Sequence, residues 1–252
     1  MAGATCQIRQ WTGVSGNGKV DRTVQGSGSL VERIQASPYE GTYHVCFHKK
    51  PLLVCVGDSI TQGDTGLGYM AQRPWPEQVG ERLGINVVNC GYCGASTVDY
   101  QTYGPWQIAR RMLPDAQYAT FGLGTNDIDL EHARASMELD DVAARMRGII
   151  EESIALQPRL DVTILSVPEF ALEQPIMTRF NMRTLMELNH AVEQLNERYQ
   201  RMCQDKGWRF LDYASSFNQR RVLYGNTIHP NQRGYDVIAG LIAERMGRVI
   251  RP

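Results

Sequence analysis

From residue 51 onward, short apolar runs alternate with longer stretches whose apolar residues recur every three to four positions. The short runs are typical of buried strands, and the longer stretches are typical of helices that bury one face. Strands that alternate with helices imply parallel β-α-β units with helices on both faces of one sheet. We therefore predict an α/β fold, a three-layer α/β/α sandwich around a central parallel sheet of about five strands.

The five predicted strands are continuous apolar runs with turn residues beside them. They span residues 52–56, 85–89, 118–123, 160–167 and 208–213. One helix is predicted over Trp75 to Leu83, since Pro76 suits a first turn and Gly84 suits a helix end. Three more helical stripes lie within residues 142–154, 185–202 and 237–249.

Residues 1–50 do not follow this alternation, because glycine and serine interrupt short polar pieces. We predict an N-terminal appendage at 1–50 and one main domain at 51–252. Three interpretations of the appendage stay open: a β-hairpin, a remnant of a neighbouring module, and a partly ordered arm.

The composition excludes several classes of protein. The 252 residues carry 26 Lys and Arg against 27 Asp and Glu, a formal net charge of −1, which argues against nucleic-acid partners and polybasic membrane binders. No apolar segment approaches the roughly 18 to 20 residues of a spanning helix, so no membrane insertion is expected. The first twelve residues lack a basic-then-apolar signal peptide, so we expect a cytoplasmic protein, with a secreted mature form as the alternative. Oligomeric state stays open.

The six cysteines do not predict a disulfide framework or a metal site in a chain of this length. Cys90 and Cys93 form a Cys-Gly-Tyr-Cys motif, but they lie in a glycine-rich loop and do not open a helix, as a redox pair would. His44, Cys46 and His48 share one face of a strand-like segment, for which a solvated face is the simpler interpretation than metal binding. We expect neither a metal nor an organic cofactor.

Small polar segments follow the first two predicted strands. After the first comes Gly57-Asp58-Ser59, where a tight turn projects the serine hydroxyl from the strand end. After the second comes a loop, residues 89–97, that contains Gly91 and Gly94. Glycine there lets a backbone N–H face an oxyanion without a Cβ in the way.

Two more segments supply complementary groups. Asn126, after the third strand, offers a side-chain amide as an oxyanion donor, and the neighbouring Asp127 is expected to hydrogen-bond backbone N–H groups. His229 precedes the last helix and is a candidate general base. Because parallel sheets bind ligands at the carboxyl ends of their strands, we expect these groups to meet there.

These four segments, in this order, resemble the SGNH (GDSL) esterase and lipase family over roughly residues 50 to 250. The resemblance implies a flavodoxin-like sandwich and a serine esterase. It implies that Ser59 is the nucleophile and that His229 takes the Ser59 proton. It further implies an oxyanion hole made of the Ser59 and Gly94 backbone N–H groups and the Asn126 amide, with Gly91 as a rival to Gly94.

One position departs from the family pattern. The family places an aspartate three residues before the histidine, where this chain has Asn226. An asparagine can accept the Nδ1–H of the histidine but supplies no negative charge. Three interpretations stay open: an engineered trap whose native residue is aspartate, a naturally slow or dyad enzyme, and a decayed triad that leaves a binding module.

The constellation predicts hydrolysis of an ester through an acyl-serine. Loops rich in amides and aromatic residues favour a short acyl ester, with acetylated carbohydrate as the first hypothesis. Candidate substrate contacts are Tyr92, Trp106 and Asp58, although Asp58 is also expected to bond nearby backbone N–H groups. Two alternatives remain: a non-catalytic sugar-binding module on the same scaffold, and an acyltransferase. A Cys90–Cys93 bridge that stiffens the oxyanion loop is a further, minor hypothesis.

Overall fold

The computed structural model describes residues 4–10, 19–26, 50–128, 138–172 and 182–250. The chain divides into two units, Met1–Lys50 and Pro51–Pro252. In the first unit, β1 (Ala4–Gln10) pairs antiparallel with β2 (Lys19–Gly26), with an irregular register between Ile8 and Arg9. An antiparallel pair agrees with a β-hairpin, one of the three interpretations that the sequence left open, and the role of this unit stays a prediction.

The second unit is built on one parallel sheet, as predicted. Its strands are β3 (Leu52–Gly57), β4 (Asn86–Gly91), β5 (Tyr118–Gly122), β6 (Asp161–Leu165) and β7 (Arg209–Leu211). They lie side by side in the order β4-β3-β5-β6-β7, each pair parallel. The chain therefore starts in the sheet at β3, adds β4 on one side and then crosses to β5 on the other. The crevice between the carboxyl ends of β3 and β5 is a topological switch point, where such sheets bind ligands.

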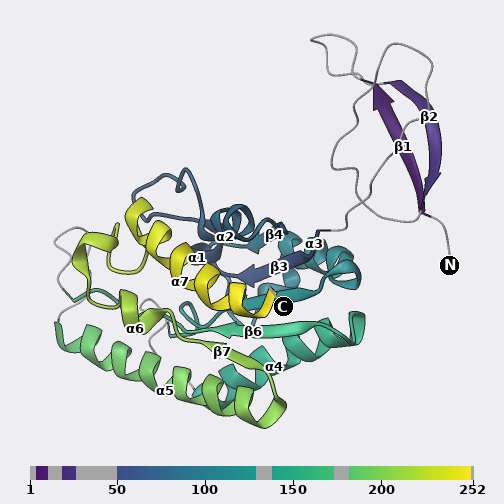
Figure 1. Cartoon of the computed structure of the whole chain (residues 1–252). Helices are drawn as coiled ribbons and strands as arrows, with labels where there is room; N and C mark the ends of the chain where they lie inside the picture. The colour runs from purple at the N-terminus through teal and green to yellow at the C-terminus, as the bar shows by residue number, and fades with distance from the viewer. Residues whose placement is uncertain (1–3, 11–18, 27–49, 129–137, 173–181, 251–252) are drawn as a thin grey trace. The chain divides into compact units, whose positions relative to one another are not determined.

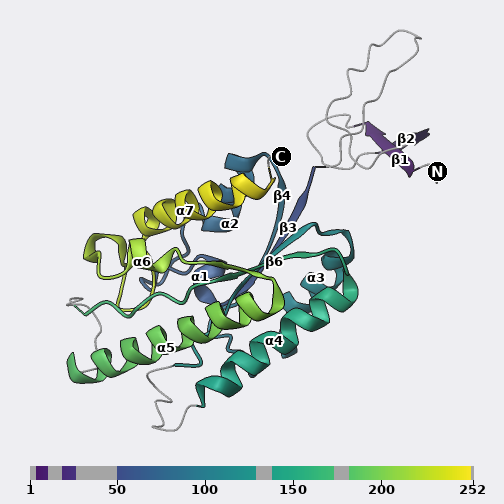
Figure 2. The same cartoon turned by 60° about the horizontal axis from the view of Figure 1, so that its bottom comes forward.

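Helices cover both faces of the sheet (Figures 1 and 2). They are α1 (Ser59–Gln62), α2 (Trp75–Leu83), α3 (Gly104–Met112), α4 (Leu139–Leu156), α5 (Met182–Lys206), α6 (Ala214–Phe217) and α7 (Gln232–Ile250). Side chains of α3, α4 and α5 share one apolar core, and those of α2, α6 and α7 share the other.

The interior strand β3 shows why the sheet is buried on both sides. Val54 and Val56 belong to the core under α3, α4 and α5, whereas Leu53 and Cys55 belong to the core under α2 and α7. Alternate side chains of a strand point to opposite faces, so a continuous apolar run suits a strand covered twice.

The predicted bounds of the five strands and of α2 are accurate to within two residues, whereas α4, α5 and α7 extend beyond their predicted stripes by up to five residues. Helix α2 spans the predicted residues, while β6 ends at Leu165 and not at 167. Ser166 N still donates to the Leu211 carbonyl oxygen of β7 at 3.1 Å, but Val167 N leaves the ladder and donates to the Asn196 side chain at 2.8 Å. Helix α3 was not predicted; within it, only Trp106 and Ala109 are buried, too few for a clear stripe.

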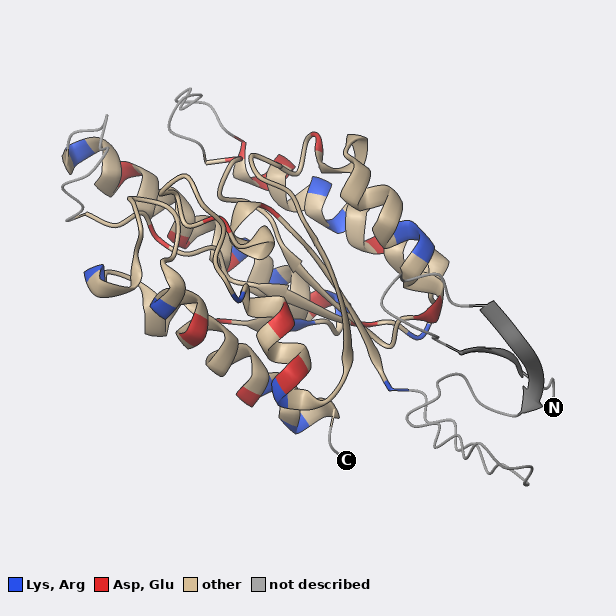
Figure 3. Cartoon of the chain, turned by 90° about the horizontal axis from the view of Figure 1, so that it is seen from above, with Lys and Arg blue, Asp and Glu red and all other residues tan. Residues whose placement is uncertain are grey.

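Acidic and basic residues occur together on the outer helices (Figure 3). Two ion pairs join α4 to α5: Asp140 with Arg198 at 2.6 Å and Glu151 with Lys206 at 2.9 Å. Every helix in the described part of the chain is too short or too polar to cross a membrane.

Candidate active site

Ser59 lies at the carboxyl end of β3, where the chain turns sharply into α1. Asp58 caps this short helix, because its Oδ1 accepts a hydrogen bond from Ile60 N at 2.9 Å. A Cβ on Gly57 would lie 2.1 Å from the Thr61 hydroxyl and 3.0 Å from the Gly122 carbonyl oxygen, so only glycine fits this turn. The turn therefore places Ser59 at the switch point between β3 and β5.

His229 and Asn226 complete a hydrogen-bonded chain with Ser59. His229 Nε2 lies 2.9 Å from Ser59 Oγ, and His229 Nδ1 lies 3.2 Å from Asn226 Oδ1. Since Asn226 Oδ1 is an acceptor, Nδ1 carries the ring proton and Nε2 is free to accept the serine proton. The sequence prediction that these three residues meet is matched by this geometry.

The orientation of the Asn226 amide is fixed from both ends. Its Oδ1 also accepts the backbone N–H groups of Ile228 at 2.8 Å and His229 at 2.7 Å. Its Nδ2 donates to the Gly66 carbonyl oxygen at 3.3 Å. The amide oxygen is therefore held toward the imidazole.

Burial sets the protonation of the imidazole. It lowers the pKa of His229 below its usual range, because the charged form loses water, while the nearby Asp64 carboxylate acts in the opposite direction. Asp64 Oδ2 lies 3.9 Å from His229 Nε2. His229 is thus neutral, and able to accept a proton, at neutral pH.

Two neighbouring loops hold the expected oxyanion donors. Gly94 adopts a left-handed backbone with φ of 80°, and its N–H and that of Ser59 have no hydrogen-bond partner in the described part of the chain. Asn126 Nδ2 donates to the Ala95 carbonyl oxygen at 2.9 Å, which ties the amide to the Gly94 loop. Tyr92 N donates to the Gly57 carbonyl oxygen at 3.0 Å, which ties the same loop to the serine turn.

Asp127 holds the Gly94 loop through hydrogen bonds to Thr97. The sequence predicted that Asp127 would bond backbone N–H groups in this way. Its carboxylate accepts hydrogen bonds from Thr97 N at 2.9 Å and Thr97 Oγ1 at 2.5 Å. Arg145 lies 3.7 Å away, and burial raises the Asp127 pKa while these donors lower it. The sequence predicted the role of Asp127 from its place beside Asn126, but its partners Thr97 and Arg145 carried no sequence signal.

Gly91 is explained by packing and not by an oxyanion role. Its N–H already donates to Asn89 Oδ1 at 3.0 Å, and a Cβ there would lie 2.1 Å from Gln62 N. Of the two glycines that the sequence offered, Gly94 is the one with an unused N–H.

The three candidate substrate contacts lie in different environments. Tyr92 is 37% exposed and stacks on Tyr103 with ring centroids 4.2 Å apart, so part of its side chain is at the surface. Trp106 is 2% exposed and packs edge-on against Tyr100, which corrects its interpretation as a substrate contact. Asp58 is equally buried, which raises its pKa to about 7, so we assign it to the helix cap.

The structure describes one of the two cysteine-containing segments that the sequence singled out. Cys90 and Cys93 are free thiols, so the structure has no bridge across the oxyanion loop. His44, Cys46 and His48 lie outside the described residues. Within the described ranges, no group of three or more His, Cys, Asp or Glu side chains is arranged to hold a metal.

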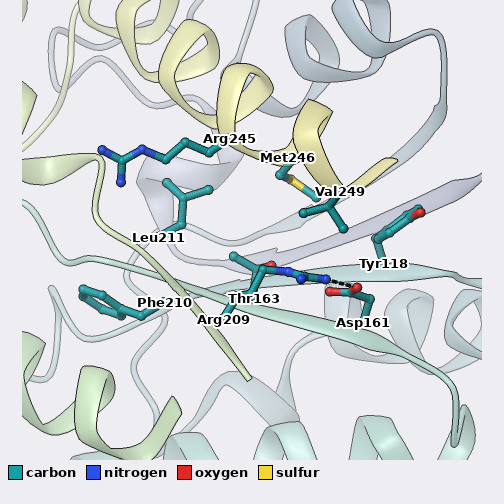
Figure 4. Close-up of a pocket in the computed structure, with 9 residues that line it drawn as sticks. All are labelled: Tyr118, Asp161, Thr163, Arg209, Phe210, Leu211, Arg245, Met246 and Val249. Carbon is teal, nitrogen blue, oxygen red and sulfur yellow. Dashed lines mark hydrogen bonds and ion pairs between the residues drawn. The ribbon is translucent and has the colours of Figure 1, made fainter. Parts of the chain in front are cut away.

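A separate hollow of about 80 Å³ lies near the starts of β5 and β6, beneath the end of α7 (Figure 4). Arg209 forms an ion pair with Asp161 beside it. The strands β3, β5 and β6 are parallel, so their carboxyl ends lie on the side of the sheet where Ser59 lies. The hollow lies at the opposite ends of the strands, away from the candidate active site.

Solved structures with a similar fold include three esterases. Est24, a carbohydrate acetylesterase from Sinorhizobium meliloti, is 17% identical, with a TM-score of 0.60 over 79% of this chain and 100% of its own. A Mycobacterium smegmatis aryl esterase is 17% identical, with a TM-score of 0.59 over 79% of this chain and 99% of its own. A catalytic mutant of Axe2, an acetylxylan esterase from Geobacillus stearothermophilus, is 18% identical, with a TM-score of 0.57 over 78% of this chain and 94% of its own.

A search of curated proteins found no match. The model of the GDSL-like lipase/acylhydrolase family matches residues 55–237, which include the Ser59 turn, the loops that carry Gly94 and Asn126, and His229. The chain therefore belongs to the GDSL-like lipase/acylhydrolase family, and its class of activity is carboxylic ester hydrolysis.

Proposed function

We propose that this chain is a serine esterase that removes short acyl groups, acetyl first among them, through an acyl-Ser59 intermediate. The observation that carries the proposal is the 2.9 Å contact between Ser59 Oγ and His229 Nε2. Serine is a weak nucleophile unless a base lies within hydrogen-bond reach, and this distance is within that reach.

The reaction follows from the hydrogen bonds of the site. His229 Nε2 accepts the Ser59 proton as Ser59 Oγ attacks the ester carbonyl carbon, and the resulting imidazolium later gives this proton to the leaving alcohol. Asn226 holds the imidazole through Nδ1–H in both states. Water then attacks the acyl-enzyme with His229 as the base again.

The negative charge of each tetrahedral intermediate needs preorganised donors. The N–H groups of Ser59 and Gly94 and the second N–H of the Asn126 amide are the proposed donors. Removing one such donor typically lowers kcat by about 10² to 10³. Asp127 keeps the Gly94 loop in place, so the donors do not reorganise during the reaction.

Acetylated carbohydrate is the proposed substrate class. The stacked and partly exposed pair Tyr92 and Tyr103 beside the Gly94 loop supports it, because an aromatic face suits the apolar face of a sugar ring. Two of the similar structures are described as a carbohydrate acetylesterase and an acetylxylan esterase, which agrees with this choice.

The test is hydrolysis of p-nitrophenyl acetate, acetylated oligosaccharides and octanoyl esters by the whole chain. We expect activity that is lost in Ser59→Ala and that favours acetyl over octanoyl esters. Tyr92→Ala should raise KM for the oligosaccharides more than for p-nitrophenyl acetate. Preference for octanoyl esters would contradict the substrate class, and activity that survives Ser59→Ala would contradict the mechanism.

The amide at position 226 favours a second candidate, a sugar-binding module without turnover. It predicts that the chain binds an acetylated glycan and that neither the chain nor Asn226→Asp hydrolyses it. Calorimetric binding with the same oligosaccharides, followed by product analysis, separates the two functions.

A further inference from the structure

One neighbour of position 226, the Gly66 carbonyl oxygen, suits an amide and not a carboxylate. The Gly66 carbonyl oxygen accepts a hydrogen bond from Asn226 Nδ2, and an aspartate would turn a carboxylate oxygen toward that carbonyl. Gly66 also packs directly on the amide, since a Cβ at this left-handed glycine would lie 2.0 Å from Asn226 Nδ2. The loop that carries Gly66 is thus clamped on an asparagine side chain.

The same loop brings a carboxylate to the imidazole from the other side. Asp64 Oδ2 lies 3.9 Å from His229 Nε2, and the two side chains are 22% and 14% exposed. Asp64 is held by three contacts: Oδ1 accepts Gly66 N at 2.7 Å, Oδ2 accepts the Cys93 thiol at 3.4 Å, and its backbone oxygen accepts the Tyr235 hydroxyl at 2.6 Å.

The other titratable groups near Asp64 and His229 do not place a second negative charge against the imidazole. Burial raises the pKa of the Cys93 thiol to about 11, and it raises that of the Tyr235 hydroxyl well above its usual range. Burial also raises the pKa of Asp58, which caps α1, to about 7, and Asp58 is not among the groups that shift the pKa of His229. The pKa of His229 responds to burial and to Asp64, which leaves Asp64 as the negative charge that faces the imidazole.

We propose that the two tasks of the family's aspartate are divided in this chain, with Asn226 orienting His229 and Asp64 supplying the negative charge that stabilises its imidazolium. The inference rests on the proposed function and assigns Asp64 as a positioning residue that acts through His229. Asp64 takes no part in the proton transfer: the Ser59 proton moves to His229 Nε2 and then to the leaving alcohol. Asn226 then keeps the orienting task of the aspartate, and Asp64 replaces part of its charge.

The experiment compares Asp64→Asn, Asp64→Glu, Asn226→Asp and the double variant Asp64→Asn with Asn226→Asp. Asp212→Asn is the matched control, because Asp212 Oδ1 likewise accepts a backbone N–H, that of Ser215 at 3.0 Å. Two readouts are taken for each: kcat and KM for p-nitrophenyl acetate, and the pKa of His229 from NMR titration of its ring protons. Circular dichroism checks folding.

We expect Asp64→Asn to lower kcat by about 10- to 100-fold with little change in KM, since a charge at about 4 Å acts strongly on the imidazolium even with partial solvent screening. It should also move the His229 titration to lower pH. Asp64→Glu should retain most of the rate, the double variant should regain the loss, and the control should match the unaltered chain.

Three results would overturn the inference: an unchanged His229 titration in Asp64→Asn, a loss confined to KM, or no recovery in the double variant. If Asp64→Asn does not fold, a Glu variant that loses the rate as a folded protein would also overturn it. Absence of Ser59-dependent hydrolysis in every variant would refute the proposed function instead, and the NMR titration would still decide the role of Asp64.

Discussion

Replacing Asn226 with aspartate adds a negative charge next to the imidazole without changing the size of the side chain. The charge would lie about 3.2 Å from His229 Nδ1, where Asn226 Oδ1 now lies. At this distance and an effective dielectric constant of about 20, it would attract the imidazolium by about 5 kcal/mol. In the free enzyme His229 is neutral, so most of this attraction appears only as the proton moves from Ser59.

The substitution also has a cost that the structure identifies. Asn226 Nδ2 no longer donates to the Gly66 carbonyl oxygen, and a carboxylate oxygen faces that carbonyl at the same place. A buried acceptor left without its donor costs about 1 to 3 kcal/mol. The difference is about 2 to 4 kcal/mol, equivalent to a gain of about 30- to 1,000-fold in kcat/KM.

This gain is smaller than the roughly 10⁴-fold loss that the reverse change causes in serine proteases, whose sites are built around an aspartate. The assay is steady-state hydrolysis of p-nitrophenyl acetate across pH, with Ser59→Ala as the blank. The acid limb of kcat/KM should also move to higher pH, because the added charge favours protonated His229. A rate at or below that of the unaltered chain, with the acid limb unmoved, would refute the reasoning.

The remaining predictions concern the nucleophile, the oxyanion hole, pH and the loop turn. Ser59→Ala and His229→Ala should each abolish burst acylation, and the double variant should lose little more than either, whereas additive losses would contradict their assignment as one unit. Asn126→Ala should lower kcat by about 10² to 10³ with KM nearly unchanged, measured on p-nitrophenyl acetate. Because burial lowers the pKa of His229 below 6.5, the base stays neutral in mild acid, so the kcat/KM acid limb should have its midpoint below pH 6.5. Gly91→Ala should destabilise the fold by more than 1 kcal/mol in urea titration, since its Cβ meets backbone at 2.1 Å, whereas Gly148→Ala, with open space in α4, should not.

The sheet and most helices followed from the sequence because their signals are local. The apolar run of β3 and the Pro76 and Gly84 signals at the ends of α2 depend on neighbouring residues only, so their bounds were predicted closely. Trp106 was misjudged for the opposite reason. An aromatic residue near loops suggested a substrate contact, but α3 turns its side chain into the core, and that direction depends on the packing of distant elements.

The hydrogen-bond chain from Ser59 to Asn226 was predicted by resemblance, whereas Asp64 was not predicted at all. Its position depends on a loop that folds back on itself, with Ala71 N donating to the Gly63 carbonyl oxygen at 2.7 Å. Residues 64 and 229 are far apart in sequence, and no spacing rule connects them. A carboxylate in a polar loop gives no signal of its charge partner until the loop is folded.

A family pattern compares residues position by position, but the electric field at an imidazole depends on the distance to every nearby charge. Asp64 Oδ2 is 3.9 Å from the ring and Asn226 Oδ1 is 3.2 Å away, so a charge at either place acts with similar strength, in the ratio 3.9/3.2 or about 1.2. Which ring nitrogen of His229 the charge faces matters more than this difference in distance. Asp64 faces Nε2, the nitrogen that also faces Ser59 Oγ, so it repels the negative charge that develops on the reacting ester as well as attracting the imidazolium. Moving the charge therefore compensates for the missing aspartate only in part, which is why a carboxylate restored on the Nδ1 side should still raise the rate.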